Sequence, residues 1–131
     1  SSAASDVYKR QRVLDAVPEA AAIGVNCTAP QYVSGLIRMI RQETDKPIVV
    51  YPNSGEYYDA AARVWRGTAE DFGARSREYA AAGARIIGGC CRTTPHDTAS
   101  IAAWVKSSRK RGDGDGDRVR GGSSARRTRH A

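Results

Sequence analysis

The feature that most constrains this chain is a threefold alternation of a short apolar run with a helix-like segment. The apolar runs cover residues 21–26, 47–52 and 84–89. Each has the length of a strand, and the middle run, "PIVVYP", is apolar throughout, as expected for a parallel strand buried on both faces. Three consecutive strand–helix units predict an α/β fold whose parallel strands are joined by right-handed crossovers.

The segments that follow these runs carry helix signals. Pro30 suits the first turn of a helix whose apolar residues recur at helical spacing. Thr68 is the expected cap of the next helix, and Gly83 is its expected C-terminal glycine. A last helix is expected to begin at residues 94–95 and to place Trp104 on its inner stripe, in the core.

Three such units make a poor free-standing domain, because a parallel sheet needs helices on both faces or closure into a barrel. The pattern therefore predicts the C-terminal part, about three βα units, of a (β/α)8 TIM barrel, a fold of about 250 residues. Such a part has parallel edges and a strand face without partners. We expect the chain to self-associate when it is alone.

Composition divides the chain into three parts. Residues 1–11 continue no repeat and are expected to be a disordered or non-native leader. Residues 12–105 form the barrel part, which a short helical segment over residues 10–19 opens. Residues 106–131 are a tail of Gly, Asp, Arg and Ser, expected to be disordered because it contains too few apolar residues for a core.

Charge and hydropathy indicate which classes of binding partner are expected. Nine Lys or Arg and three Asp lie in the tail, so most of the net charge of +7 belongs to it. A basic tail can contact phosphates, but this one has no aromatic residue to stack on bases, so nucleic acid is not an expected partner. No apolar run approaches the roughly 20 residues that span a bilayer, and no signal peptide is recognisable. We expect a cytoplasmic protein without a membrane partner.

The three cysteines follow predicted strands. Cys27 follows the first strand, and Cys90 and Cys91 follow the third. Because the carboxyl ends of parallel strands lie on one face, these thiols are expected to converge. Three thiolates leave one position of a tetrahedral zinc ion open, so the pattern predicts a catalytic Zn²⁺ site. The two glycines at residues 88–89 leave room for the backbone to bend both cysteines toward the metal.

A zinc ion held by three thiolates favours a particular chemistry. The site has one net negative charge, so it is a weak Lewis acid for water but holds a further thiol well. A substrate thiol in the open position loses its proton and stays nucleophilic, which favours alkyl transfer to sulfur. The alternative is a vicinal disulfide between Cys90 and Cys91, or buried thiols, in a non-catalytic metal-binding fragment or a vicinal-dithiol redox or interaction module.

Three further polar residues are candidates for substrate binding. Asn26 and Asn53 lie at strand ends that face the expected site, although strand-end asparagines often satisfy turn backbone instead. Arg92 can bind a carboxylate through two parallel hydrogen bonds, or lie on a solvated loop.

The remaining aromatic and imidazole side chains have plainer interpretations. His96 falls in the first turn of the last helix and is expected at the surface. Tyr57, Tyr58 and Trp65 lie in a long predicted loop, where they either wall a substrate pocket or pack the loop down. Packing is the favoured interpretation.

Three segments, "GVNCTAP", "KPIVVYPNSGEYYD" and "GARIIGGCCRTTPHD", resemble successive C-terminal signatures of the homocysteine S-methyltransferases. The resemblance covers about residues 13–105, and the family's first five or so βα units have no counterpart here. It implies a (β/α)8 barrel whose zinc is held by three cysteines, which match Cys27, Cys90 and Cys91. It implies methyl transfer from a sulfonium donor to homocysteine, giving methionine. The "YPNSGE" segment resembles the branch that uses S-methylmethionine or S-adenosylmethionine.

Overall fold

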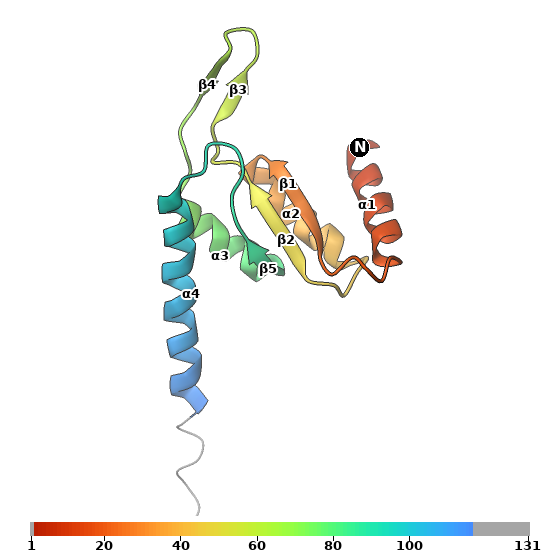
Figure 1. Ribbon diagram of the computed structural model, residues 1–131, viewed down its shortest axis with the longest axis vertical. Coiled ribbons are helices and arrows are strands. Elements are labelled where there is room, and N and C mark those ends of the chain that lie inside the picture. The colour runs from red at the N-terminus through yellow and green to blue at the C-terminus, as the bar shows by residue number, and fades with distance from the viewer. Residues whose placement is uncertain (1, 117–131) are drawn as a thin grey trace, which may run out of the picture.

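The structure is a computed structural model, and it describes residues 2–116 of the 131-residue chain. Its centre is a parallel sheet of three strands in the order β1-β2-β5. β1 covers Ile23–Thr28, β2 covers Ile48–Pro52 and β5 covers Ala84–Ile87. Figure 1 shows the three strands running in one direction, which confirms the predicted α/β fold with a parallel sheet.

Two helices pack on one face of this sheet. α2 covers Pro30–Arg41 between β1 and β2, and α3 covers Phe72–Ala82 directly before β5. Both helices contact the strands and each other. Their inward side chains join those of the strands in one core, whose members are Ile23, Val33, Ile37, Ile40, Ile48, Val50, Tyr79 and Ala84.

The second strand is buried on one face rather than on both. Ile48 and Val50 are fully buried, whereas Val49 is half-buried and Tyr51 is 40% exposed. Because both helices that pack on the sheet lie on the same side, the side chains that alternate toward the other side stay accessible. The prediction of a strand covered on both faces is therefore wrong for the described residues.

The starts of two helices can be compared with their predicted caps. Asp71, not Thr68, caps α3, and its Oδ1 accepts a hydrogen bond from the Ala74 N–H at 3.0 Å. The predicted cap is wrong because residues 68–70 form an irregular segment between β4 and α3, before the helix begins. At the last helix, Thr94 and Asp97 form the reciprocal capping box: each side chain accepts from the other's backbone N–H, at 2.7 and 3.4 Å.

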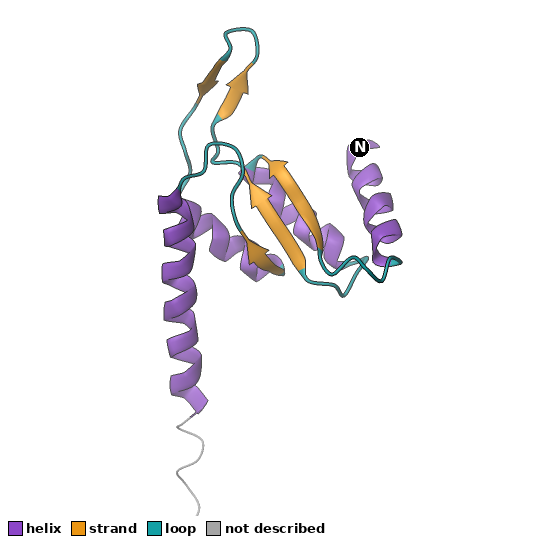
Figure 2. Cartoon of the chain, viewed as in Figure 1, coloured by secondary structure: helices purple, strands orange, loops and turns teal. Residues whose placement is uncertain are grey.

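The predicted long loop after β2 is a β-hairpin. β3 covers Tyr57–Asp59 and β4 covers Val64–Arg66, paired antiparallel. The Asp59 carboxylate closes the turn, since it accepts from the backbone N–H groups of Ala61 and Ala62 and from Arg66 Nε. These hydrogen bonds, that from Ala62 first, lower the pKa of Asp59. Figure 2 shows the hairpin projecting beyond the carboxyl end of the sheet.

The aromatic side chains of this hairpin do not pack it down. Tyr57 is 60% exposed, Tyr58 is 52% exposed and Trp65 is 36% exposed. Tyr58 and Trp65 contact each other instead, with ring centroids 5.5 Å apart. The favoured interpretation, packing of the loop against the domain, is therefore wrong, because the hairpin stands off the sheet.

The N-terminal helix begins earlier than predicted and ends at Asp15, so residues 16–19 of the predicted helical segment are not helical. α1 covers Ser2–Asp15, so residues 2–11 of the expected disordered leader are helical. The segment contains no Gly or Pro, which suits a helix. Its C-terminal end is tied to the loop before β2: Arg12 pairs with Glu43 at 2.9 Å, and the Lys46 ammonium donates to the Leu14 carbonyl at 3.3 Å.

The last helix also runs further than predicted. α4 covers Pro95–Gly116, so the expected disordered tail begins with helix over residues 106–116. Residues 106–111 contain no Gly or Pro and extend the helix without a break. The rest of the predicted tail, residues 117–131, lies outside the described residues. Among the helices that are described, none has the length and apolar character needed to cross a membrane.

A groove of about 600 Å³ lies between β5 and α4, and we call this surface the β5–α4 flank. Ile86, 45% exposed, lines it from the strand, while Ile101 and Trp104 line it from the helix. Trp104 is half-buried rather than a core residue. Its indole Nε1 donates to Ser76 Oγ at 2.7 Å, which leaves part of the ring facing the groove.

Candidate metal centre

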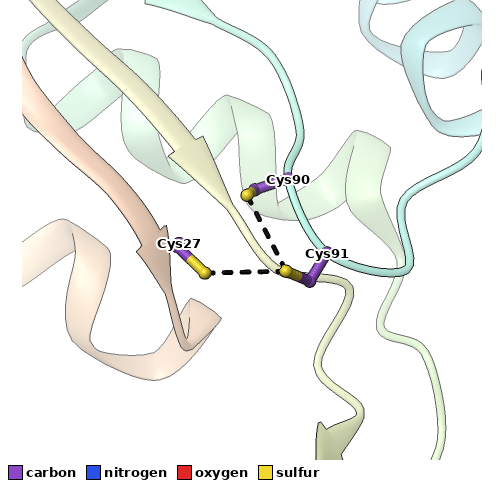
Figure 3. Close-up of side chains that lie close together, drawn as sticks. All are labelled: Cys27, Cys90 and Cys91. Atoms are coloured by element: carbon purple, nitrogen blue, oxygen red, sulfur yellow. Dashed lines mark hydrogen bonds between the residues drawn. The ribbon is translucent and has the colours of Figure 1, made fainter.

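The three cysteines lie together at the carboxyl end of the sheet. Cys27 belongs to the end of β1, and Cys90 and Cys91 lie in the loop after β5. Figure 3 shows the three side chains pointing toward one another. The sulfur of Cys91 is 3.6 Å from that of Cys27 and 3.9 Å from that of Cys90, and all three lie within 4.8 Å of one another. The predicted convergence is therefore confirmed.

Two of these distances, 3.6 and 3.9 Å, fit tetrahedral coordination of one metal ion. Two sulfur ligands at about 2.3 Å from a zinc ion, separated by the tetrahedral angle, are about 3.8 Å apart. A disulfide needs about 2.05 Å, so the cysteines are free thiols in this structure. Three converging thiols supply three ligands and leave a fourth position for another group. In the part of the chain that the structure describes, no other group of three potential ligands gathers in this way.

Cys27 is presented by an irregularity in β1. The register with β2 shifts between Asn26 and Thr28, and Cys27 has a φ of +54°, in the left-handed region. β1 continues through Cys27 to Thr28, which pairs with Pro52, although the cysteine was predicted to follow the strand. A left-handed, non-glycine residue in a bulge turns its side chain out of the regular alternation. This turn brings the thiol toward the cysteine loop.

The loop of Cys90 and Cys91 is bound to the end of β2. The Cys90 N–H donates to the Pro52 carbonyl at 2.8 Å, and the Cys91 carbonyl accepts from the Ser54 N–H at 3.1 Å. Thr93 closes the loop, because its hydroxyl donates to the Cys90 carbonyl at 2.7 Å. The backbone around both cysteines is therefore fixed by hydrogen bonds within the chain.

Asn53 joins the two parts of the site. Its backbone N–H donates to the Thr28 carbonyl at 2.9 Å, at the end of β1. Its side-chain Oδ1 accepts from the Cys91 N–H at 3.1 Å. One residue thus spans the strand end that carries Cys27 and the loop that carries Cys91, which is the turn-satisfying role weighed for it above.

The two glycines before the cysteines make room for close packing. A Cβ on Gly88 would lie 2.7 Å from the ring of Tyr51, and a Cβ on Gly89 would lie 2.7 Å from the Cβ of Thr93. Real Cβ contacts are not this short, so a side chain at position 88 would push the loop away from β2, and one at position 89 would displace Thr93 within the loop. This agrees with the predicted role of residues 88–89.

Clustering of the thiols changes their acidity. The neighbouring Cys27 thiol, followed by that of Cys90, raises the pKa of Cys91 to about 11. Ionising one thiol beside two others is unfavourable, because the negative charge receives little compensation. A bound cation removes this penalty, so the cluster is chemically suited to take up a metal with release of protons.

The other candidate residues have different surroundings. Asn26 is exposed on β1, opposite Tyr51 of β2. Arg92 lies next to Cys91, and its guanidinium pairs with Glu56 at 3.4 Å and lies over Trp65. His96 is exposed on α4, as expected.

Two residues at the site carry contacts that sequence reasoning missed. Ser54 is 2% exposed and its backbone holds Cys91, while Glu56 holds Arg92. The polar run "NSGE" directly after a buried strand was the available signal, because polar groups at strand ends form turns and sites.

The family model and two of the sequence relatives that match this chain carry the description homocysteine S-methyltransferase. A family model described as homocysteine S-methyltransferase matches residues 3–105. The chain is 49% identical over 96 residues to the homocysteine S-methyltransferase YbgG of Bacillus subtilis. This alignment covers 72% of the chain and 30% of that relative. It is 50% identical over 100 residues to homocysteine S-methyltransferase 4 of Zea mays, which covers 72% of the chain and 29% of the relative.

Solved structures agree with these matches. The chain resembles the homocysteine methyltransferase MmuM of Escherichia coli in its metallated form, with a TM-score of 0.59 and 33% identity. The match covers 74% of this chain and 28% of MmuM. The apo form of MmuM gives the same TM-score. The chain thus spans less than a third of the length of these relatives.

Proposed function

We propose that this chain, which belongs to the homocysteine S-methyltransferase family, supplies the metal centre of an enzyme that methylates the thiol of homocysteine. The observation that carries the proposal is the group of three free thiols at metal-ligand spacing. Thiol ligands favour zinc among the common metals, and three protein ligands suit a catalytic rather than a closed site.

In this proposal Cys27, Cys90 and Cys91 would hold Zn²⁺, and the fourth position would be open to the sulfur of homocysteine. Bound zinc lowers the pKa of a coordinated thiol and keeps it as a thiolate at neutral pH. The bulge at Cys27 and the hydrogen bonds at Asn53 preorganise the three ligands. The backbone N–H of Cys91 already donates to Asn53 Oδ1, so it is not available to bind the substrate.

The proposed reaction is methyl transfer between two sulfur atoms. The homocysteine thiolate forms a bond to the methyl carbon, and the electron pair of the breaking carbon–sulfur bond stays on the donor sulfur. A sulfonium donor, S-methylmethionine or S-adenosylmethionine, becomes a neutral thioether, and homocysteine becomes methionine. The resemblance of the "YPNSGE" segment, residues 51–56, supports a sulfonium donor. A site with three thiolates also attracts a cation.

Asn26, Asn53 and Arg92 remain proposed substrate-binding residues. Arg92 is the strongest of the three, because a guanidinium suits the carboxylate of an amino-acid substrate. It pairs with Glu56 in this structure, so a substrate carboxylate would have to compete with that carboxylate. Asn53 has its Oδ1 engaged and its side-chain amide available as a donor.

We further propose that residues 12–105 are the last three βα units of a (β/α)8 barrel, with residues 1–11 and 106–131 outside it. The parallel sheet, its open face and the length of the relatives support the barrel assignment. The family match begins at residue 3, and α1 and α4 continue across the two proposed bounds. Three free thiols suit a reducing compartment such as the cytoplasm.

Zinc binding and thiol accessibility test the metal centre directly. The wild-type chain should bind one Zn²⁺ per chain and lose the reactivity of all three thiols to a thiol reagent until a chelator is added. Cys91→Ser and Cys27→Ser should each weaken zinc binding by more than about 100-fold, beyond the cost of losing a supporting hydrogen bond. Thr98→Ser, on the exposed side of α4, is the matched control and should bind zinc like the wild type.

Two results would contradict the proposal. Zinc binding that survives replacement of all three cysteines would exclude the thiols as ligands. Recovery of two thiols only after a reductant, with no effect of a chelator, would favour the vicinal-dithiol alternative at Cys90 and Cys91. Methyl transfer itself is best assayed in a full-length protein that contains this sequence, with homocysteine and each sulfonium donor in turn.

A further inference from the structure

The hairpin β3–β4 contacts the cysteine loop through three side chains. Arg92, which directly follows the ligand Cys91, directs its guanidinium to Glu56, with Nη2 3.4 Å from Oε1. The same guanidinium lies over the ring of Trp65 on β4, with Cζ 6.0 Å from the ring centroid. Arg92 therefore joins the metal loop to both the base and the second strand of the hairpin.

Glu56 is held in place by a buried serine. The Ser54 hydroxyl donates to Glu56 Oε2 at 3.0 Å and accepts from the Glu56 N–H at 3.2 Å. Ser54 is also the residue whose N–H donates to the Cys91 carbonyl. The Glu56 side chain is 18% exposed, so its pair with Arg92 is less screened than an ordinary surface pair. The segment over residues 54–56 therefore binds both the Cys91 backbone and the Arg92 side chain.

The hairpin turns one face toward Arg92. Tyr58 pairs with Trp65 across the two strands, so both rings lie on that face. Tyr57 pairs with Arg66 and lies on the opposite face, where it is 60% exposed. A guanidinium over an aromatic face is attracted by the negative potential of the ring, so Trp65 favours this position of Arg92.

The backbone of Arg92 has an unfavourable conformation, which the contacts with Glu56 and Trp65 can stabilise. Its φ is +64°, in the left-handed region that non-glycine residues rarely occupy. A residue in this region persists where its surroundings hold it. The neighbouring residue is a metal ligand, so a change in the backbone of Arg92 would move the sulfur of Cys91.

We propose that Glu56 and Trp65 are positioning residues, which clamp Arg92 and thereby keep Cys91 in metal-binding geometry. Metal affinity then depends on the hairpin, although no hairpin residue is itself a ligand. This inference rests on the proposed zinc site of Cys27, Cys90 and Cys91. It adds that contacts from the hairpin increase the zinc affinity of that site.

Zinc affinity of hairpin variants tests the clamp. In competition with a chromophoric chelator, Trp65→Ala and Glu56→Gln should each weaken zinc binding about tenfold, as the loss of supporting contacts does at other metal sites. Tyr57→Ala removes an aromatic residue from the opposite face and should bind zinc like the wild type. Trp65→Phe restores a ring and should recover most of the affinity. Equal zinc affinity of Trp65→Ala and Tyr57→Ala would overturn the clamp.

A spectroscopic readout separates positioning from general destabilisation. The chain has two tryptophans, so Trp104→Phe leaves Trp65 as the sole tryptophan. Zinc should change the Trp65 emission with an end point at one equivalent, and Glu56→Gln should shrink that change while far-ultraviolet circular dichroism stays the same. An emission that ignores zinc would contradict the coupling. Failure of the wild-type chain to bind zinc through its thiols would instead overturn the proposed function itself.

Discussion

At the carboxyl end of the sheet, backbone and side-chain hydrogen bonds join β1, β2 and the cysteine loop, whereas the β5–α4 flank is an open apolar groove. At the carboxyl end, Asn53 accepts from the Cys91 N–H and Ser54 donates to the Cys91 carbonyl. On the β5–α4 flank, the apolar side chain of Ile86 is 45% exposed. Within the described residues β5 pairs with β2 alone.

This difference separates the local site from the fold that supports it. The candidate metal centre draws its three thiols and their supporting hydrogen bonds from residues within this chain. The flank is apolar without a described partner, and relatives of which the match covers less than a third contain further chain that could cover such a surface. A chain of this length therefore contains the whole thiol cluster and an incomplete hydrophobic core.

The largest effect is expected from removing apolar side chains on the two sides of the sheet. Ile37 is fully buried between α2 and the strands, so Ile37→Ala should lower the free energy of unfolding by about 3 kcal/mol. Ile86 lies on the flank, so Ile86→Ala should cost about 1 kcal/mol or less. Urea denaturation measures both. Equal losses would show that the flank is covered, and a dependence on protein concentration would identify a second copy as the cover.

A smaller effect is expected at the carboxyl end. Asn53→Ala removes the acceptor of the Cys91 N–H, which should loosen the cysteine loop and weaken zinc binding about tenfold. The control is Gln42→Ala, at the exposed end of α2, which should leave zinc affinity unchanged. Isothermal titration of zinc into the two variants provides the measurement. An unchanged affinity in Asn53→Ala would show that the loop is held without this hydrogen bond.

The smallest effect concerns alkaline pH. Burial raises the pKa of Tyr79 to about 12, above its ordinary value near 10. Between these two values the unfolded chain loses the phenol proton and the folded chain keeps it, so stability should fall as pH rises through this window. Below about pH 10 the contribution is fully present. Thermal unfolding at a series of pH values measures it.

Tyr79→Phe is the matched variant for that experiment. It should reduce the alkaline loss to the part that belongs to Cys91, whose pKa is also raised. It should cost about 1 kcal/mol at neutral pH, because the Tyr79 hydroxyl donates to the Pro30 carbonyl at 3.2 Å. An identical alkaline loss in Tyr79→Phe would assign the effect to another group.

The sheet and the thiol cluster could be predicted because each rests on a strong local pattern. The three β-branched runs match β1, β2 and β5 to within two residues at each end, and Pro30 and Gly83 mark helix ends as expected. The cysteines converge because parallel strands carry their carboxyl ends to one edge, a rule that needs no side-chain detail.

What the sequence did not reveal depends on contacts between distant segments. The sequence predicts a loop where the hairpin lies, because "NSGEYYD" begins with turn residues and the hairpin strands are only three residues long. The left-handed φ of Cys27 and Arg92 has no local signature, since neither residue is glycine or asparagine. Both conformations follow from the packing of β1 and the cysteine loop around β2.

The tight approach of Gly88 to Tyr51 has a consequence for how this sequence can vary. Any side chain at position 88 meets a ring that belongs to the neighbouring strand, so the two positions compete for one volume. A methyl group at position 88 becomes acceptable once Tyr51 gives way to a small residue, and the ring is harmless while position 88 stays bare. Mutations at these two sites are therefore expected to act as mutual suppressors, and drift at one site is restrained by the occupant of the other.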